Sequence, residues 1–289
     1  MHTADITNLP QKCDHLVFSD AVQDDLRVAD STLWACCFQR IGARNASFEK
    51  SSLTQCFFED TYLRKARFRD VDLTGSTFRG CNLEKATFQG CNFRYCTFQA
   101  TRLNPDEIIG CFPVEPNLRR DLARNLRKNF EALGDKVTSD VFLNLEIEAY
   151  EQELLGAFRR KTEYYRSHYS NVDQAVAGLR YVVSKLSGIV WGYGHRVRRL
   201  LASYAILSVV FATITYFGRF RFNVDGQTSA RALDFWESMY YTFAGTLGLG
   251  VAPLSPVSSA AKALLLCEAF LGTLFLALLA AAAYRRIAR

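Results

Sequence analysis

The chain has 289 residues, of which 49% are hydrophobic and 22% charged, and its formal net charge is +6. An aromatic content of 13% excludes a wholly disordered chain. The modest charge argues against a nucleic-acid-binding domain, which would concentrate basic residues on one face. Charged residues are unevenly spread, because residues 200–289 hold 7 of the 35 Lys and Arg and 4 of the 29 Asp and Glu. This imbalance predicts a water-soluble part joined to a membrane part.

Residues 1–30 form a polar and acidic lead segment. They contain no basic start followed by an apolar run, which a cleavable secretory signal would need. We therefore expect the N-terminal part to stay in the cytosol.

A repeat of five residues runs through residues 31–103. Leu or Phe occupies every fifth position twelve times in succession, from Phe48 to Leu103, and a small or compact residue stands two positions before each. A period of five fits neither an α-helix nor a β-strand. It fits a solenoid in which the large and the small residue of each pentapeptide share the interior, so that stacked coils bury a continuous core.

This pattern resembles the pentapeptide-repeat family, whose consensus is a small residue, a polar residue, Leu or Phe, and two variable polar residues. The resemblance implies a right-handed quadrilateral β-helix of three to four coils over residues 31–103. Some members of that family imitate DNA and carry an acidic surface. Because residues 40–103 hold 11 Lys and Arg against 6 Asp and Glu, DNA mimicry is disfavoured and no nucleic-acid partner is expected.

The repeat also accounts for most of the cysteines. Nine are many for a cytosolic protein, but five of them occupy the small inward position: Cys36, Cys56, Cys81, Cys91 and Cys96. Cysteine can serve there as a compact apolar filler. Because no CxxC pair is present, we expect neither a metal site nor a disulfide framework.

Residues 104–190 are expected to form a cytosolic α-helical connector. Asn104 and Pro105 are a helix-start signal. Apolar residues at helical spacing then lead to Gly134 as a plausible end, Ser139 opens a second helix, and a third runs from Asn171 to about Ser187. Such a connector could cover the open end of the β-helix, form an oligomerisation collar, or do both.

Residues 191–289 are expected to form an α-helical two-span membrane domain. Residues 200–217 carry no charge and residues 263–284 carry only Glu268, so each segment is long enough to cross a bilayer. Arginines lie just before the first span and just after the second. The positive-inside rule then predicts cytoplasmic N- and C-termini. We expect the membrane to be a bacterial inner membrane.

The segment between the spans predicts a re-entrant pore loop. An aromatic amphipathic pore helix contains Trp236, Glu237, Tyr240 and Tyr241, and an uncharged glycine-rich stretch follows. Such backbone is tolerated at membrane depth only beside protein or a water-filled cavity, and it can turn its carbonyls toward ions. The expected filter residues are Thr246, Leu247, Gly248, Leu249, Gly250, Val251 and Ala252.

This region resembles the two-transmembrane pore-loop family of tetrameric cation channels, which carry Thr-Val-Gly-Tyr-Gly where this chain has residues 246–250. Leu249 replaces the filter tyrosine, and Val251 replaces the aspartate that usually follows. Either Gly248-Leu249-Gly250 or Gly250-Val251-Ala252 can stand at the signature. In the second span, Glu268 could brace the filter or reach the interface, Gly272 could be a gating hinge or a packing contact, and Leu276, Ala280 and Ala283 could line the inner pore.

The sequence favours a homotetrameric ion channel for K⁺ or Na⁺, embedded in lipid, whose pentapeptide repeats serve assembly, regulation or a cytosolic protein partner. The alternative is a membrane-anchored scaffold in which the two spans only tether the repeats. No enzyme signature occurs in the chain, so we expect no catalytic residues and no cofactor.

Overall fold

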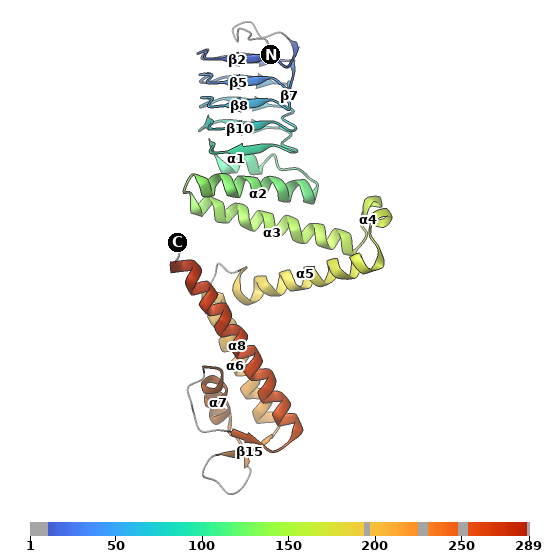
Figure 1. Ribbon diagram of the computed structural model, residues 1–289, viewed down its shortest axis with the longest axis vertical. Helices are drawn as coiled ribbons and strands as arrows, with labels where there is room; N and C mark the ends of the chain where they lie inside the picture. The colour runs from blue at the N-terminus through green and yellow to red at the C-terminus, as the bar shows by residue number, and fades with distance from the viewer. Residues whose placement is uncertain (1–10, 194–196, 225–230, 248–253, 288–289) are drawn as a thin grey trace. The chain divides into compact units, whose positions relative to one another are not determined.

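The computed structural model describes residues 11–193, 197–224, 231–247 and 254–287 (Figure 1). The chain divides into two compact units, Met1–Gly178 and Leu179–Arg289. The division falls inside helix α5 (Asn171–Trp191), whereas the sequence suggested a boundary near the end of that helix.

The first unit begins with a β-solenoid built from four parallel sheets. One sheet contains β1 (Lys12–Asp14), β4 (Thr32–Trp34) and β7 (Ser52–Thr54); the next contains β2 (Val17–Ser19), β5 (Cys37–Gln39), β8 (Phe57–Glu59), β10 (Thr77–Arg79) and β13 (Thr97–Gln99); the third contains β3 (Arg27–Ala29), β6 (Ser47–Glu49), β9 (Arg67–Arg69) and β12 (Thr87–Gln89); and the last contains β11 (Asn82–Leu83) and β14 (Arg102–Leu103). Neighbouring strands in each sheet are parallel and 20 residues apart, as Phe38 pairs with Phe58. Four pentapeptides therefore make one turn.

The solenoid starts earlier than the sequence suggested. Strand β1 pairs with β4 and β2 pairs with β5, so the coil begins at Lys12 rather than at residue 31. The solenoid has about five turns instead of three to four, because residues 12–30 belong to it rather than to a lead segment. Gln23 interrupts the apolar positions in this first turn, and end repeats of a solenoid are commonly atypical.

Two columns of stacked phenylalanines fill the solenoid interior. Phe18, Phe38, Phe58, Phe78 and Phe98 form one column, with successive ring centroids 4.7 to 5.2 Å apart. Residues 48, 68 and 88 form the other column, at 4.7 and 4.8 Å. All of these rings are buried, so the prediction of inward period-five residues is confirmed.

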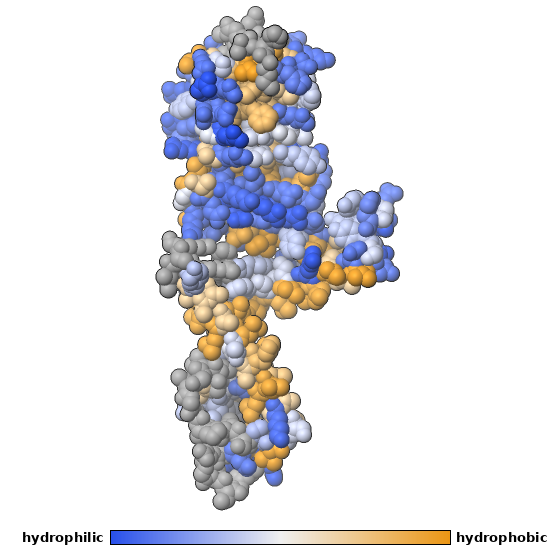
Figure 2. All heavy atoms as spheres, in the orientation of Figure 1, coloured by the Kyte–Doolittle hydropathy of each residue, from blue (hydrophilic) through white to orange (hydrophobic). Residues whose placement is uncertain are grey.

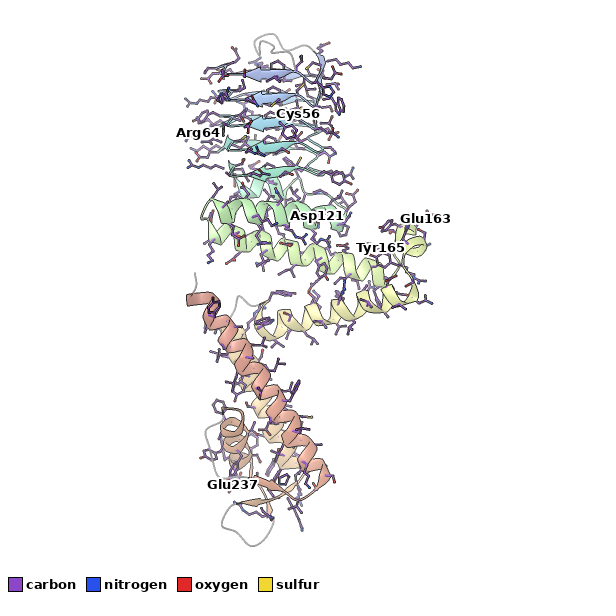
Figure 3. The ribbon with its side chains drawn as sticks, viewed as in Figure 1. Cys56, Arg64, Asp121, Glu163, Tyr165 and Glu237 are labelled. Atoms are coloured by element: carbon purple, nitrogen blue, oxygen red, sulfur yellow. The ribbon has the colours of Figure 1, made fainter. Side chains whose placement is uncertain are left out.

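The cysteines of the small position are buried beside these columns, as predicted. Figure 3 shows Cys56 inside the coil. Burial raises the pKa of Cys96 to about 12, which keeps this thiol protonated and unreactive at neutral pH. All nine cysteines are free thiols.

The solenoid turns its corners with left-handed backbone. Every fifth residue from His15 to Ala100 has a positive φ angle, and only Gly75, Gly80 and Gly90 among them are glycines. A side chain in this conformation costs roughly 1–2 kcal/mol per residue. Regular backbone hydrogen bonds between successive coils and the buried aromatic columns must offset that cost.

Helices α1 (Pro105–Ile109) and α2 (Pro116–Ala132) close the last coil of the solenoid (Figure 1). As predicted, Asn104 caps α1 by accepting a hydrogen bond from the backbone N–H of Asp106, and Pro105 follows it. Apolar residues of α2 join the solenoid core, among them Leu122, Leu126 and Phe130.

Helix α2 ends in a Schellman motif around Gly134. Gly134 has a φ angle of 77°, and its N–H bonds to the carbonyl of Glu131, while the N–H of Asp135 bonds to the carbonyl of Phe130. Helix α3 (Lys136–Phe158) starts at once. Its N-cap is Asp135 rather than Ser139, which lies buried inside the helix.

Helix α3 lies against α2 and is joined to it by ion pairs. Arg120 meets Glu153 at 2.5 Å, and Glu146 accepts from Arg124 at 2.7 Å and from Arg127 at 2.9 Å. A short helix that the sequence did not suggest, α4 (Glu163–His168), then leads to α5. Helix α5 begins at Asn171 as predicted and continues to Trp191.

The second unit contains two long apolar helices, α6 (Val197–Phe217) and α8 (Ser259–Ile287). Both are long and apolar enough to cross a membrane, as the sequence predicted. Between them lie helix α7 (Phe235–Leu247) and a small antiparallel sheet in the order β16 (Arg231–Ala232), β15 (Arg221–Val224), β17 (Leu254–Pro256).

Candidate functional site

The candidate site is the hairpin of α6, α7 and α8. The aromatic segment predicted as a pore helix is helical, since α7 runs from Phe235 to Leu247. Thr246 and Leu247 form its last turn. The predicted filter residues Gly248, Leu249, Gly250, Val251 and Ala252 lie outside the described residues.

Helix α7 begins with a reciprocal capping arrangement. The side chain of Asp234 accepts a hydrogen bond from the N–H of Trp236 at 2.8 Å, and the carboxylate of Glu237 accepts from the N–H of Asp234 at 3.1 Å. This is a capping box. Arg231 donates to both oxygens of Glu237, at 2.6 and 2.7 Å. Glu237 therefore anchors the start of α7 to the small sheet (Figure 3).

The two faces of α7 differ in character. Ser238 and Thr242, one turn apart, are almost completely buried. The hydroxyl of Ser238 has no hydrogen-bond partner among the described residues. Trp236 and Tyr240 are exposed on the other side, while Tyr241 is half-buried against the core of the small sheet. A single copy of the chain thus leaves large aromatic side chains of α7 uncovered.

A buried polar contact joins α7 to α8. Glu268 is only 7% exposed, and its carboxyl group accepts a hydrogen bond from the hydroxyl of Thr242. An ionisable residue inside an apolar helix usually has a specific partner. Glu268 therefore contacts the helix that precedes the predicted filter, and its two expected roles, bracing the filter or reaching the interface, stay predictions.

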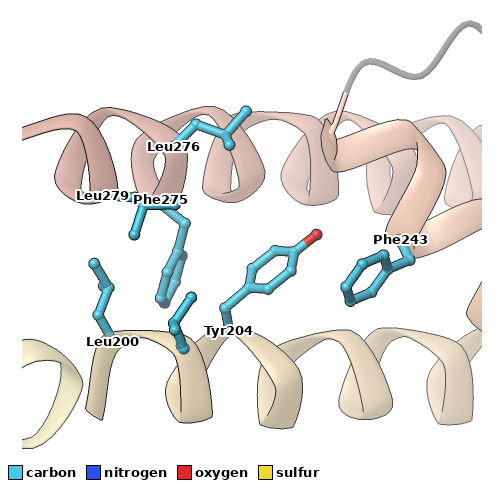
Figure 4. Close-up of a pocket in the computed structure, with 7 residues that line it drawn as sticks. Leu200, Tyr204, Phe243, Phe275, Leu276 and Leu279 are labelled. Atoms are coloured by element: carbon cyan, nitrogen blue, oxygen red, sulfur yellow. The ribbon is translucent and has the colours of Figure 1, made fainter. Parts of the chain in front are cut away.

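Aromatic contacts join α7 to α6. The ring of Tyr204 in α6 lies 5.4 Å from Phe243 of α7 and 5.8 Å from Phe275 of α8. These residues line an apolar cavity of about 160 Å³ together with four leucines: Leu200, Leu201, Leu276 and Leu279 (Figure 4). Three helices therefore meet around one tyrosine.

The remaining predicted residues of α8 lie in two environments. Gly272 is buried within the unit, and whether it acts as a hinge or a packing contact stays a prediction. Leu276 lines the apolar cavity and is 38% exposed. Ala280 and Ala283 are exposed along the same helix. These three remain available to a lumen, to lipid or to another copy of the chain.

The small sheet is a feature that the sequence interpretation missed. Phe222 in β15 is 1% exposed and packs with Leu233 and Ala261. Its neighbour Arg221 is exposed. The alternation of polar and apolar residues over 219–224 was the available sequence signal for a strand. The sheet ties the ends of the segment that contains α7 to the start of α8. Within the described ranges, no cluster of His, Cys, Asp or Glu could hold a metal ion.

Comparison with known proteins concerns the solenoid. Residues 30–105 match the family model described as "Pentapeptide repeat region", so the chain contains a pentapeptide-repeat region with a β-solenoid fold. No curated protein matches the chain.

Several solved structures are similar to part of the chain. One is a trypsin-treated form of QnrB1, a plasmid-mediated fluoroquinolone resistance protein, at 20% identity and a TM-score of 0.25 over 36% of this chain and 51% of that one. Another is Rfr23 from the cyanobacterium Cyanothece 51142, at 18% identity and 0.22 over 34% and 67%. A third is a pentapeptide repeat protein of the Arabidopsis thaliana thylakoid lumen, at 25% identity and 0.19 over 35% and 74%. The match thus spans about half the length of this trypsin-treated form of QnrB1.

Proposed function

We propose that four copies of this chain form a pore-loop ion channel in a bacterial inner membrane. Helices α6 and α8 would span the bilayer, and both termini would lie in the cytoplasm. The pentapeptide repeats, as a right-handed quadrilateral β-helix, would serve assembly, regulation or binding of a cytosolic protein. The protein would act without a catalytic site or cofactor.

The fixation of α7 between two apolar helices is the observation that carries this proposal. A tether needs only a short polar turn between its spans. Here a helix of 13 residues, about 20 Å long, is capped by Asp234 and Glu237 and hydrogen-bonded through Thr242 to buried Glu268. A helix held in this way can support the glycine-rich stretch that follows it in the sequence.

Closure by several copies follows from the physics of the bilayer. A water-filled path must be enclosed, and one hairpin with one re-entrant helix cannot enclose it. Rotational symmetry around an axis solves this problem. The exposed Trp236 and Tyr240 supply apolar surface that such neighbours could cover.

The proposed permeant ion is K⁺ or Na⁺. An uncharged stretch at residues 246–252 offers backbone carbonyls rather than charged side chains. Because Leu249 stands where related filters carry tyrosine, we expect weaker discrimination between the two ions than in those channels.

Bilayer recording of the purified protein in asymmetric KCl and NaCl tests the proposal. A reversal potential near the cation equilibrium potential supports a cation channel. Gly248→Ala and Gly250→Ala should reduce or abolish the current while the oligomer stays intact. Gly110→Ala is the matched control, since Gly110 lies at the end of α1 with an ordinary φ of −62° and room for a Cβ. Unchanged current in both filter variants would show that residues 246–252 do not line the pore, and the absence of current from the natural protein would favour the membrane-anchored scaffold.

A further inference from the structure

Cys91 and Cys111 are two thiols at the end of the solenoid that helices α1 and α2 close. They are 20 residues apart, which is the length of one turn. The thiol of Cys91 donates to the carbonyl of Phe68, 23 residues earlier, at 3.5 Å. Cys111 repeats this contact with the carbonyl of Phe88, again 23 residues earlier, at 3.6 Å. Cys111 therefore takes the small inward position of the next layer, although it lies in the connection between α1 and α2.

The two thiols differ in their access to water. Cys91 is 7% exposed, whereas Cys111 is only partly buried. The face of the first unit that Figure 2 shows carries mostly hydrophilic side chains, so an oxidant dissolved in water can reach this part of the chain. The side chain of Cys91 hydrogen-bonds to the sulfur of Cys111, which lowers the pKa of Cys111 to about 6. Cys111 is therefore largely a thiolate at neutral pH, and the thiolate is the reactive form.

We propose that Cys111 is an oxidation site for hydroperoxides and that Cys91 converts the product into a disulfide. The Cys111 thiolate attacks one oxygen of hydrogen peroxide, the O–O bond breaks, and hydroxide departs, which leaves a sulfenic acid on Cys111. The Cys91 sulfur then attacks the Cys111 sulfur, the S–O bond breaks, and the departing hydroxyl takes the proton of Cys91. In total, the two thiols lose two electrons and two protons, and the peroxide becomes two molecules of water.

The register of the coil suits this bond. Neighbouring strands of a sheet lie about 4.8 Å apart, and disulfides join Cα atoms that are roughly 4.4–6.8 Å apart. The bond closes a loop of 20 residues that contains the last coil and α1, so it fixes the start of the connection to α2 covalently. Disulfides in the cytosol are usually transient and redox-sensing. The inference goes beyond the proposed channel and does not depend on it, because both thiols belong to the first unit.

Peptide mapping of the full-length protein after exposure to hydrogen peroxide tests the proposal. Free thiols are first blocked with N-ethylmaleimide, and trypsin then places Cys91 in residues 86–94 and Cys111 in residues 103–119. We expect these two peptides to be linked in the non-reduced digest and separated by dithiothreitol. Cys36 and Cys56 are the matched control, since they are also 20 residues apart but both are 0% exposed. Their peptides should be linked several-fold less.

Two serine variants separate the roles of the thiols. Serine fits the small inward position, because Ser76 occupies it in another layer. In Cys91→Ser the sulfenic acid on Cys111 has no resolving thiol, so dimedone should label it, and Cys111→Ser should show neither the label nor the link.

Linked peptides in the natural protein together with this label support the proposal. A natural protein in which dimedone labels Cys111 but no link to Cys91 forms overturns the disulfide. An unmodified Cys111, or equal linkage of Cys36 with Cys56, overturns the oxidation site. Bilayer current is recorded separately, so a missing current counts against the channel and leaves this result unchanged.

Discussion

The side chain of Asn129 makes two hydrogen bonds with the backbone of Thr101, as if it were the next strand of the solenoid. Its carbonyl oxygen accepts from the N–H of Thr101 at 2.8 Å, and its amide donates to the carbonyl of Thr101 at 2.8 Å. One turn earlier in α2, Asn125 accepts from the N–H of Phe98 at 2.7 Å. An open strand edge would leave these groups unpaired or invite pairing with another chain. Two asparagines on a helix thus close the sheet edge.

Removing this closure should destabilise the solenoid. Asn129→Ala leaves the N–H and C=O of Thr101 unpaired in a buried place, which should cost about 1–3 kcal/mol. Thermal unfolding followed by circular dichroism, together with hydrogen exchange at the Thr101 amide, measures the loss. Asn144→Ala is the control, because Asn144 is an exposed asparagine of α3. Equal melting temperatures of the two variants would contradict the closure role.

Truncating a phenylalanine at the centre of the aromatic column should strongly destabilise the solenoid. Phe78 is fully buried between Phe58 and Phe98. Phe78→Ala removes both ring contacts and leaves a cavity, so we expect a loss of about 3–5 kcal/mol in the free energy of unfolding. Phe57→Ala, on the exposed outer face of the same sheet, should cost far less. Denaturant unfolding of both variants distinguishes the two positions, and similar losses would argue against the inward column.

A double-mutant cycle can measure the coupling energy between Glu268 and Thr242. Glu268→Ala and Thr242→Val each remove the hydrogen bond that joins α8 to α7, so the double variant should lose less than the sum of the single losses. Couplings of this type in membrane proteins average about 0.6 kcal/mol. Unfolding in detergent and single-channel amplitude are the measurements. Glu268→Gln keeps an acceptor for Thr242, so its stability and channel amplitude should remain close to those of the natural protein. Strictly additive losses in the double variant would show that the pair does not act together.

The cap of α3 predicts a pH dependence. Asp135 accepts from the hydroxyl and the N–H of Thr138, which lowers its pKa in the folded state below the usual 3.8. The cap therefore stabilises the protein above the unfolded pKa, and this contribution fades as the pH falls through the folded pKa. Asp135→Ala should cost about 1 kcal/mol at neutral pH and progressively less in acid. Unfolding free energies of both proteins between pH 7 and pH 3 provide the test, and a constant difference would exclude this linkage.

Membrane topology can be tested at positions that the structure places on the surface. A cysteine at exposed Arg221, in the segment between the spans, should react with an impermeant maleimide on spheroplasts. A cysteine at exposed Asn144 should react only after lysis. Natural Cys13 is a poor reporter, since its thiol is buried in the first coil. The opposite labelling pattern would invert the proposed orientation.

Much of the solenoid could be predicted because Leu or Phe marks every fifth position of the repeat. Phe48 to Leu103 form an unbroken series, and their inward direction follows from it. The first turn was missed because Gln23 interrupts that series. The left-handed corners were not predictable residue by residue, since Lys50, Lys65 and Tyr95 have no local preference for positive φ and are held there by the coil.

The candidate site was predictable as an order of segments but not as a set of contacts. Charge-free length marked α6 and α8, and aromatic residues marked α7. The pairing of Glu268 with Thr242 joins segments that are distant in sequence, so no local pattern reveals it. The same holds for Arg231 with Glu237, whose geometry depends on the small sheet that holds the arginine.

Because one turn of the coil takes 20 residues, the solenoid can be lengthened by whole turns without changing the direction of its faces. Duplicating one whole turn would add another layer, about 4.8 Å thick, with the same sheets facing the same directions. An insertion of five residues would instead rotate every later side chain by one face. Since Asn125 and Asn129 bind main-chain atoms, they would accept any last layer whatever its outward residues are. The outer residues and the length of the solenoid can therefore change while its attachment to the helices stays the same.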